Sequence, residues 1–228
     1  MKKLLLLTLA AVLIAVPASA RWGQQGGWGG GNWGQEPTSA TISAGDEEHL
    51  VFMREEEKLA RDVYIAFSQM YSRSRSFGRI DDSEQKHMDA VLVLLNKYGI
   101  EDPSTNDNPG AFTGEKYGEY FTDMYNELIG RGSANLLEAM YVGAFIEERD
   151  MIDIRQCNQA ILDANPDVTE CGLDTTEKTD IQRTMTNLLE GSKNHLRAYV
   201  QQIERRIGYG NYEAQLLTQE EVDAILGR

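Results

Sequence analysis

The sequence predicts an all-α fold, a four-helix bundle with one long crossover connection and short accessory helices. Apolar residues recur at alternating spacings of three and four in four long segments, the mark of helices with one buried face. Runs of β-branched residues are few. The first connection is short and the second, residues 99–132, is long, which fits a bundle in which one connection crosses its full length.

The four long helices are expected at about 47–72, 79–98, 133–155 and 177–206. The second should stop at Gly99, a residue that commonly ends helices. Each helix has a seam of positions that should face the core. The seams are Leu50, Met53, Glu57, Ala60, Tyr64, Phe67 and Tyr71; Ile80, Glu84, His87, Val91, Leu94 and Tyr98; Leu136, Met140, Gly143, Glu147, Asp150 and Ile154; and Ile181, Met185, Leu188, Ser192, His195, Tyr199 and Gln202.

The connections complete the predicted fold. A short basic loop at 72–79 suits antiparallel neighbours, and the long crossover contains an amphipathic stretch that predicts a short helix at about 115–130. Residues 45–206 are thus assigned to the bundle. Residues 207–228 form a C-terminal segment whose short helix, near 218–226, opens with Thr218 and Glu221 in capping-box spacing and packs on the bundle.

Residues 1–20 have the pattern of a signal peptide. Lys2 and Lys3 precede an apolar stretch, and Ala18-Ser19-Ala20 forms a small-residue cleavage site. The apolar stretch is short for a membrane span, and no other run of about 18 apolar residues follows. We therefore expect an exported protein, periplasmic or extracellular, with no stable membrane span after cleavage.

Residues 21–44 are rich in glycine and contain all three tryptophans, a composition typical of a flexible linker. The Trp-Gly spacing is also compatible with binding to a surface or a carbohydrate. The formal net charge of −14 argues against nucleic acid and anionic membranes as partners and favours cationic partners, metal ions among them.

Cys157 and Cys171 are the only cysteines. In an exported protein an isolated pair at this separation predicts a disulfide. A metal site is the weaker interpretation, because no further cysteine or histidine lies nearby in the sequence.

The four seams share an unusual feature, since polar residues interrupt each of them. The seams contain four carboxylates, two imidazoles and no lysine, and buried carboxylates without a cation are very unfavourable. Two divalent cations would balance four negative charges. The predicted metal ligands are Glu57, Glu84, His87, Glu147, Asp150 and His195.

Carboxylate and imidazole ligands without thiolate suit two iron ions, with manganese or zinc as alternatives. A Glu from each of two helices with Glu-x-x-His from the others is the ligand set of di-iron carboxylate bundles. Glu56 is the fallback ligand for Glu57, and Glu148 for Glu147. We expect Glu55 on the outer face of the first helix and His49 at the protein surface.

These residues carry a resemblance. The stretches EKLARDVY from Glu57 and FGRIDDSEQKH from Phe77 resemble the first two helices of the rubrerythrin branch of ferritin-like proteins. More closely, MREEEKLARDVY, SEQKHM, GAFIEERDMIDI and GSKNHLRAY resemble a ferritin-like family of bacterial and archaeal proteins of undetermined function. The likeness covers about residues 47–203 and implies a ferritin-like fold with a di-metal centre. Ser192 departs from it, standing where the fourth helix usually carries a Glu; Asp150 is the substitute carboxylate.

Three functions are compatible with this pattern. The leading one is a di-iron oxidoreductase of ferroxidase or peroxidase type, in which ferrous iron reacts with oxygen or peroxide. Without a rubredoxin-like Cys-x-x-Cys module in the sequence, a peroxidase cycle would need an external electron donor. The alternatives are a non-catalytic protein that sequesters or delivers metal, and a metal-free helical interaction module.

Overall fold

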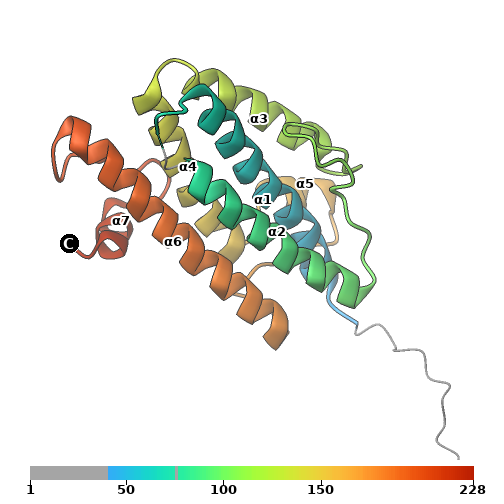
Figure 1. Cartoon of the computed structure of the whole chain (residues 1–228). Helices are drawn as coiled ribbons and strands as arrows, with labels where there is room; N and C mark the ends of the chain where they lie inside the picture. Colours follow the sequence, from blue (N-terminus) through green and yellow to red (C-terminus); the bar gives the residue numbers. More distant parts are fainter. Residues whose placement is uncertain (1–40, 75–76) are drawn as a thin grey trace, which may run out of the picture. The chain divides into compact units, whose positions relative to one another are not determined.

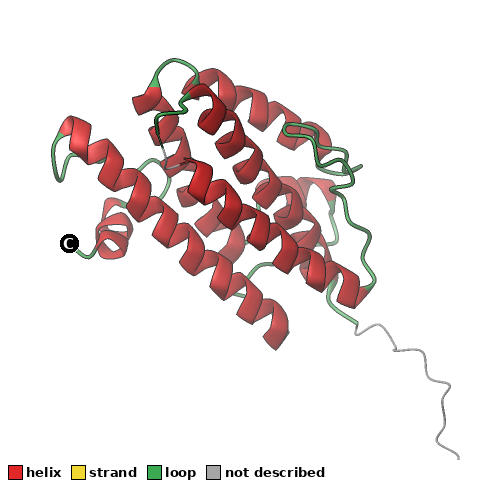
Figure 2. Ribbon diagram, in the orientation of Figure 1, coloured by secondary structure: helices red, strands yellow, loops and turns green. Residues whose placement is uncertain are grey.

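The computed structural model describes residues 41–74 and 77–228, and all of the regular secondary structure in these ranges is helical (Figures 1 and 2). The predicted all-α class is confirmed. The helices of the described ranges are α1 (Ala44–Met70), α2 (Phe77–Tyr98), α3 (Gly118–Gly132), α4 (Leu136–Arg155), α5 (Gln159–Ala164), α6 (Thr179–Ile207) and α7 (Gln219–Leu226).

Local sequence signals explain where several helices begin and end. Ser43 and Asn135 cap α1 and α4, each accepting a hydrogen bond from a backbone N–H of the first turn. The predicted capping box of Thr218 and Glu221 is present at α7. Gly99 follows the last residue of α2 with a φ of 71°, a left-handed conformation that glycine adopts without strain.

The long helices pack both on their neighbours in the sequence and on helices far away in it. α1 contacts α2, α3 and α4, and α6 contacts α4, α2 and α7. Figure 1 shows α1 lying between α2 and α3. One apolar core joins these helices, and the aromatic rings of Tyr64, Phe67, Phe77 and Tyr199 pack together within it.

Helix α1 is buried on nearly every side, including its charged residues. The crossover at 99–117 covers one side of it. Arg54 donates two hydrogen bonds of 3.0 Å to Asp102, and Lys58, fully buried, donates to the carbonyl of Asn108 (3.1 Å). Asp62 pairs with Lys58 and accepts a hydrogen bond from the Gly110 N–H (2.9 Å). These buried charges hold the long connection against the helix.

Glu55 lies in the same contact, so its predicted place on the outer face is wrong. The side chain is fully buried, and Oε1 accepts a hydrogen bond from the Gly114 N–H at 3.3 Å. A helix that packs only on its seam would leave this position in water. The crossover folds back over α1 and covers it.

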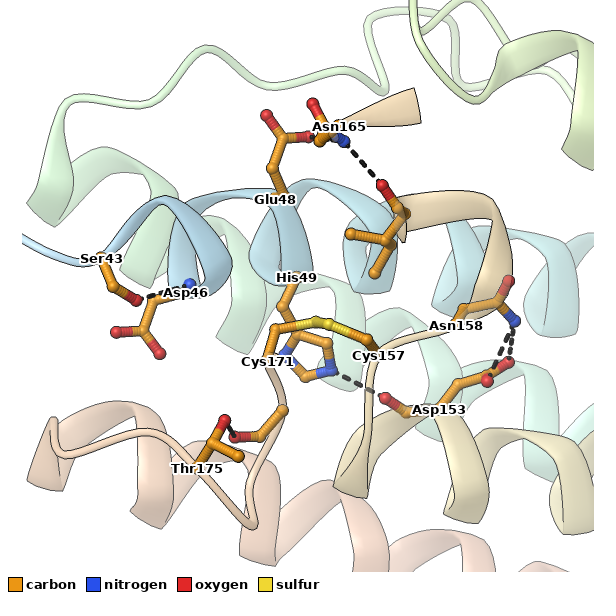
Figure 3. Close-up of a disulfide and its surroundings, with 12 residues drawn as sticks. Ser43, Asp46, Glu48, His49, Asp153, Cys157, Asn158, Asn165, Cys171 and Thr175 are labelled. Carbon is orange, nitrogen blue, oxygen red and sulfur yellow. Dashed lines mark hydrogen bonds between the residues drawn. A yellow bond between two sulfur atoms is a disulfide. The ribbon is translucent and has the colours of Figure 1, made fainter. Parts of the chain in front are cut away.

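The predicted disulfide joins Cys157 to Cys171 (Figure 3). The loop that it closes contains α5, a helix that the sequence reading missed and that Asn158 caps. His49 lies beside this loop. Its predicted surface position is wrong, because the residue is buried and its Nε2 is 2.7 Å from the carbonyl oxygen of Asp153.

The predicted signal peptide, residues 1–20, and residues 21–40 of the predicted linker lie outside the described residues. Within the described residues, none of the helices combines the length and the apolarity that crossing a membrane requires.

The disulfide gives a prediction about stability. Replacing both cysteines by serine (Cys157→Ser, Cys171→Ser) should lower the free energy of unfolding by about 3 kcal/mol, because the cross-link closes a loop of 15 residues or so in the unfolded chain. Guanidinium denaturation followed by circular dichroism measures this. Thiol labelling of the wild-type protein before reduction should find no free thiol; two labelled cysteines would contradict the pairing.

Candidate metal centre

Side chains from four helices converge at one level of the core. Within the described residues they form two groups that share Glu84. Glu57, Glu84 and His87 make the first, and Glu84, Glu147 and His195 the second. In each group one ligand atom per residue lies within 4.8 Å of the others. The structure thus brings together all of the predicted ligands except Asp150.

Glu84 lies between the two imidazoles. Its Oε2 is 2.7 Å from Nδ1 of His87, and its Oε1 is 2.9 Å from Nδ1 of His195. Each imidazole also approaches a second carboxylate: His87 Nδ1 is 3.2 Å from Glu57 Oε2, and His195 Nδ1 is 3.4 Å from Glu147 Oε2. The two sides of Glu84 have the same composition: Glu57 and His87 lie on one side, and Glu147 and His195 on the other.

The cluster is buried, and several of its polar atoms are not satisfied by the protein. The carboxylates of Glu57, Glu84 and Glu147 are 1–2% exposed, whereas the two imidazoles are 11–12% exposed. Buried polar atoms without a hydrogen-bond partner cost free energy and are rare in folded proteins. Within the described residues, Glu57 Oε1 and Asp150 Oδ1 are such atoms, whereas Glu84 Oε1 and His195 Nδ1 form an ion pair at 2.9 Å without meeting hydrogen-bond geometry.

The electrostatics of the metal-free cluster follow from burial and from the short distances. Burial raises the pKa of Glu57 to about 7, against the lowering effect of His87. Burial would also raise the pKa of Glu84, but the neighbouring imidazoles of His195 and His87 outweigh it and lower the pKa to about 2. Without metal, Glu84 is therefore an anion between two cations.

The histidines show the reciprocal effect. Burial would lower their pKa values, but Glu57 and Glu84 raise the pKa of His87 to about 12, and Glu147 and Glu84 raise that of His195 to about 11. Both imidazoles are thus doubly protonated and positively charged at neutral pH in the metal-free protein. A metal ion would compete with these protons for the same nitrogen atoms.

Tyr64 supports the second group. Its hydroxyl donates a 2.6 Å hydrogen bond to Glu147 Oε1, the oxygen directed away from His195. The sequence predicts Tyr64 and Tyr199 as core residues whose hydroxyls have a partner, and Glu147 is that partner for Tyr64. Tyr64 is two turns after Glu57 on the same face of α1, and that spacing was the available signal. Tyr199 is also fully buried, and its hydroxyl has no hydrogen-bond partner among the described residues.

Asp150 lies beside the cluster without joining either group. It is buried, and its Oδ2 accepts a hydrogen bond from Ser192 Oγ while Oδ1 has no partner. Burial and the negative charge of Glu57 raise its pKa well above the ordinary value. Ser192, the position that departs from the ferritin-like pattern, therefore holds this carboxylate in place.

Glu56, the fallback for Glu57, belongs to a neighbouring polar contact. Its Oε1 is 3.4 Å from Arg149 Nε, which is also 3.2 Å from Asp153 Oδ2. The side chain is buried between α1 and α4 and lies outside both ligand groups. The geometry favours Glu57 as the ligand from α1.

Glu148, the fallback ligand for Glu147, instead binds the C-terminal segment. It is fully buried and accepts hydrogen bonds from the Tyr212 hydroxyl (2.7 Å) and from the backbone N–H groups of Gln215 (2.8 Å), Leu216 (2.6 Å) and Leu217 (3.0 Å). Hydrogen bonds to an ionised carboxylate are stronger than neutral ones. Glu148 anchors the C-terminal segment to α4, and the local sequence gave no sign of these distant donors.

The fold and the cluster define an all-helical protein with a buried carboxylate–histidine site shared by four helices. The chain belongs to the family described as uncharacterized protein domain (DUF2202), whose family model matches residues 46–228. It is 38% identical over 186 residues to the uncharacterized protein MJ0754 of Methanocaldococcus jannaschii, covering 81% of this chain and 88% of that protein.

A solved structure extends the comparison to the fold. The crystal structure of the hypothetical protein MJ0754 from Methanococcus jannaschii superposes with a TM-score of 0.70 at 34% identity, over 85% of this chain and 98% of that chain. The helical fold described here is thus similar to one solved for an archaeal protein.

The role of Glu148 can be tested directly. Glu148→Ala should lower the free energy of unfolding by about 3 kcal/mol, because it leaves the buried Tyr212 hydroxyl and three partly buried N–H groups without an acceptor. Hydrogen exchange should become faster at residues 215–217, and metal binding should be unchanged. Glu138→Ala, an exposed glutamate on the same helix, is the matched control. Loss of metal with unchanged exchange would show that Glu148 is a ligand instead.

Proposed function

We propose that this protein is a ferritin-like metalloprotein that binds two divalent metal ions in a carboxylate centre. The observation that carries the proposal is the position of Glu84, whose two oxygens each lie within 2.9 Å of a different imidazole nitrogen. A carboxylate in this position would bridge two ions. His87 and Glu57 would complete one side, and His195 and Glu147 the other.

The residues present fit such a centre in charge and in donor type. Glu57, Glu84, Glu147 and Asp150 would carry four negative charges when ionised, which two divalent ions balance. Glu57 Oε1 and Asp150 Oδ1, which have no hydrogen-bond partner among the described residues, lie at the cluster, as expected of ligand atoms. Within the described residues, no lysine or arginine forms an ion pair with Glu57, Glu84, Glu147 or Asp150.

The surrounding residues would orient the ligands. Tyr64 would hold Glu147 through its unshared oxygen, and Ser192 would hold Asp150, whose free Oδ1 would supply a further oxygen ligand. Partners of this kind fix the direction of ligands and raise metal affinity. The pairing of Asp150 with Ser192 would replace the carboxylate that ferritin-like proteins usually carry on the fourth helix.

The packing of the long helices supports the ferritin-like assignment. The contacts α1–α2, α2–α6, α6–α4 and α4–α1 close a ring of four helices, and a long connection that includes α3 joins α2 to α4. This is the arrangement expected of a four-helix bundle with a crossover, which builds its metal site from side chains of facing helices.

Oxygen and nitrogen ligands without thiolate suit iron or manganese, with zinc as an alternative, and di-iron is the form that the resemblance to ferritin-like proteins favours. Two ferrous ions in such a centre would supply the electrons for reducing oxygen or peroxide. The protein's own contribution would be ligand geometry and a site from which most water is excluded. An exported protein of this type that cycled as a peroxidase would draw electrons from an external donor.

The metal count tests the proposal. Wild-type protein dialysed against Fe²⁺ without oxygen should retain two ions per chain, measured by elemental analysis. Glu84→Ala should retain neither, because Glu84 serves both sides. His87→Ala should weaken one ion by more than about 100-fold, beyond the usual effect of losing a partner outside the ligand shell.

Glu190→Ala is the control, an exposed glutamate on α6. Retention of two tightly bound ions by His87→Ala would place the site elsewhere. Oxygen consumption on adding Fe²⁺ to the loaded protein then separates an oxidase from a protein that only binds metal.

The pKa values give a second, independent prediction. Because His87 and His195 have pKa values of about 12 and about 11 in the metal-free protein, each ion must displace an imidazole proton. Raising the pH should tighten binding of Mn²⁺ about tenfold per pH unit for each ion, and lowering it below 7 should weaken binding further as Glu57 takes up a proton. Calorimetric titration at several pH values measures this dependence. Affinity that does not change with pH would rule out imidazole ligation.

A further inference from the structure

Gly191 lies in the interior of α6, one residue before Ser192, and the ring of His87 packs directly against it. A Cβ atom built at this position would be 2.5 Å from Nε2 of His87 and 2.6 Å from Cε1. Ordinary van der Waals separations are about 3.5–4.0 Å, so even one methyl group could not be accommodated with the ring in place.

The helix itself gives no reason for glycine here. Glycine inside a helix is destabilising relative to alanine because its backbone loses more conformational freedom on folding. Gly130 in α3 provides the comparison within the same chain. A Cβ atom at Gly130 would meet nothing within 4 Å, whereas one at Gly191 would collide with a predicted metal ligand.

The imidazole ring transmits this contact to the cluster. The Nε2–Cε1 edge of His87 faces Gly191, and Nδ1, on the same rigid ring, faces Glu57 at 3.2 Å and Glu84 at 2.7 Å. Relieving a collision at Gly191 requires the ring to move by about 1 Å, the difference between the built contact and an ordinary one. Because the ring is rigid, such a movement changes the distances from Nδ1 to both carboxylates.

We propose that Gly191 is a positioning residue for His87, and that the Glu57–Glu84–His87 side of the centre depends on the absence of a side chain at position 191. The expected effect on metal affinity rests on the proposed function, whereas the expected effect on the position of the His87 ring does not. His195 lies on α6 with a ring centroid 5.7 Å from that of His87, and the three atoms nearest to a Cβ built at Gly191 all belong to His87. The two sides of the centre should therefore respond differently to a change at this position.

The first test uses metal-free protein and histidine side-chain NMR signals. Gly191→Ala should shift the imidazole signals of His87, leaving those of His195 and His49 close to their wild-type positions. Gly130→Ala, the matched glycine-to-alanine change, should shift none of them. Unchanged His87 signals in Gly191→Ala would overturn the proposal, whether or not the protein binds metal.

The second test titrates the same variants with Co²⁺ and follows the visible absorption of the bound ion. Wild type and Gly130→Ala should bind two ions with matching spectra. Gly191→Ala should bind one ion at least tenfold more weakly and lose the corresponding part of the spectrum. If wild type binds no Co²⁺ the proposed function fails, while the NMR result still decides the role of Gly191.

A double variant separates an effect through His87 from general damage to α6. In the His87→Ala background, Gly191→Ala should cause no further loss of Co²⁺ affinity, because the ring that it displaces is absent. A further tenfold loss in the double variant would show that Gly191 acts through the helix instead, and would contradict the proposal.

Discussion

The contact between Glu84 and the two imidazoles is the constraint on which the rest of the structure depends. A carboxylate that is 2% exposed must be balanced by positive charge, and His87 and His195 lie within 2.9 Å of its two oxygens. This places α2 and α6 at a fixed distance and register.

Gly191 lets the His87 ring contact α6. Gly143 makes room in the same way for Tyr199, which packs on α4 where a Cβ atom would lie 2.6 Å away. Small residues therefore appear where rings must cross between helices close to the cluster.

The charged run of α1 shows how one helix can be buried on all sides. Consecutive helical residues point about 100° apart, so five neighbours face different parts of the fold. Arg54 binds the crossover, Glu55 accepts from Gly114, Glu56 lies near Arg149, Glu57 faces the cluster, and Lys58 pairs with Asp62. Each charge meets a different partner. The helix that supplies the first ligand is thus fixed by contacts with the crossover and with α4 as well as by its apolar seam.

The amino-acid sequence predicted the features that depend on local periodicity. The long helices, the end of α2 at Gly99, the capping box at Thr218 and the disulfide are all present. The predicted ligands lie in the two groups, except for Asp150, which is buried beside them. Periodicity shows which face of a helix is buried, but not which remote segment covers the other faces. For that reason Glu55 and His49 were misplaced, and the partners of Glu148, more than sixty residues away, gave no local signal. The departure at Ser192 was visible, but its hydrogen bond to Asp150 depends on how α4 and α6 pack.

The central proposal is that Glu84, with the histidines and carboxylates on either side of it, would hold two metal ions. Anomalous X-ray diffraction from crystals of the metal-loaded protein, collected at the absorption edge of iron, tests it most directly. Two anomalous peaks are expected, one beside His87 and one beside His195, separated by about 3.5–4 Å with Glu84 between them. The account would be contradicted by a cluster free of anomalous density in protein that retains metal elsewhere, or by a single ion that leaves His87 and His195 uncoordinated.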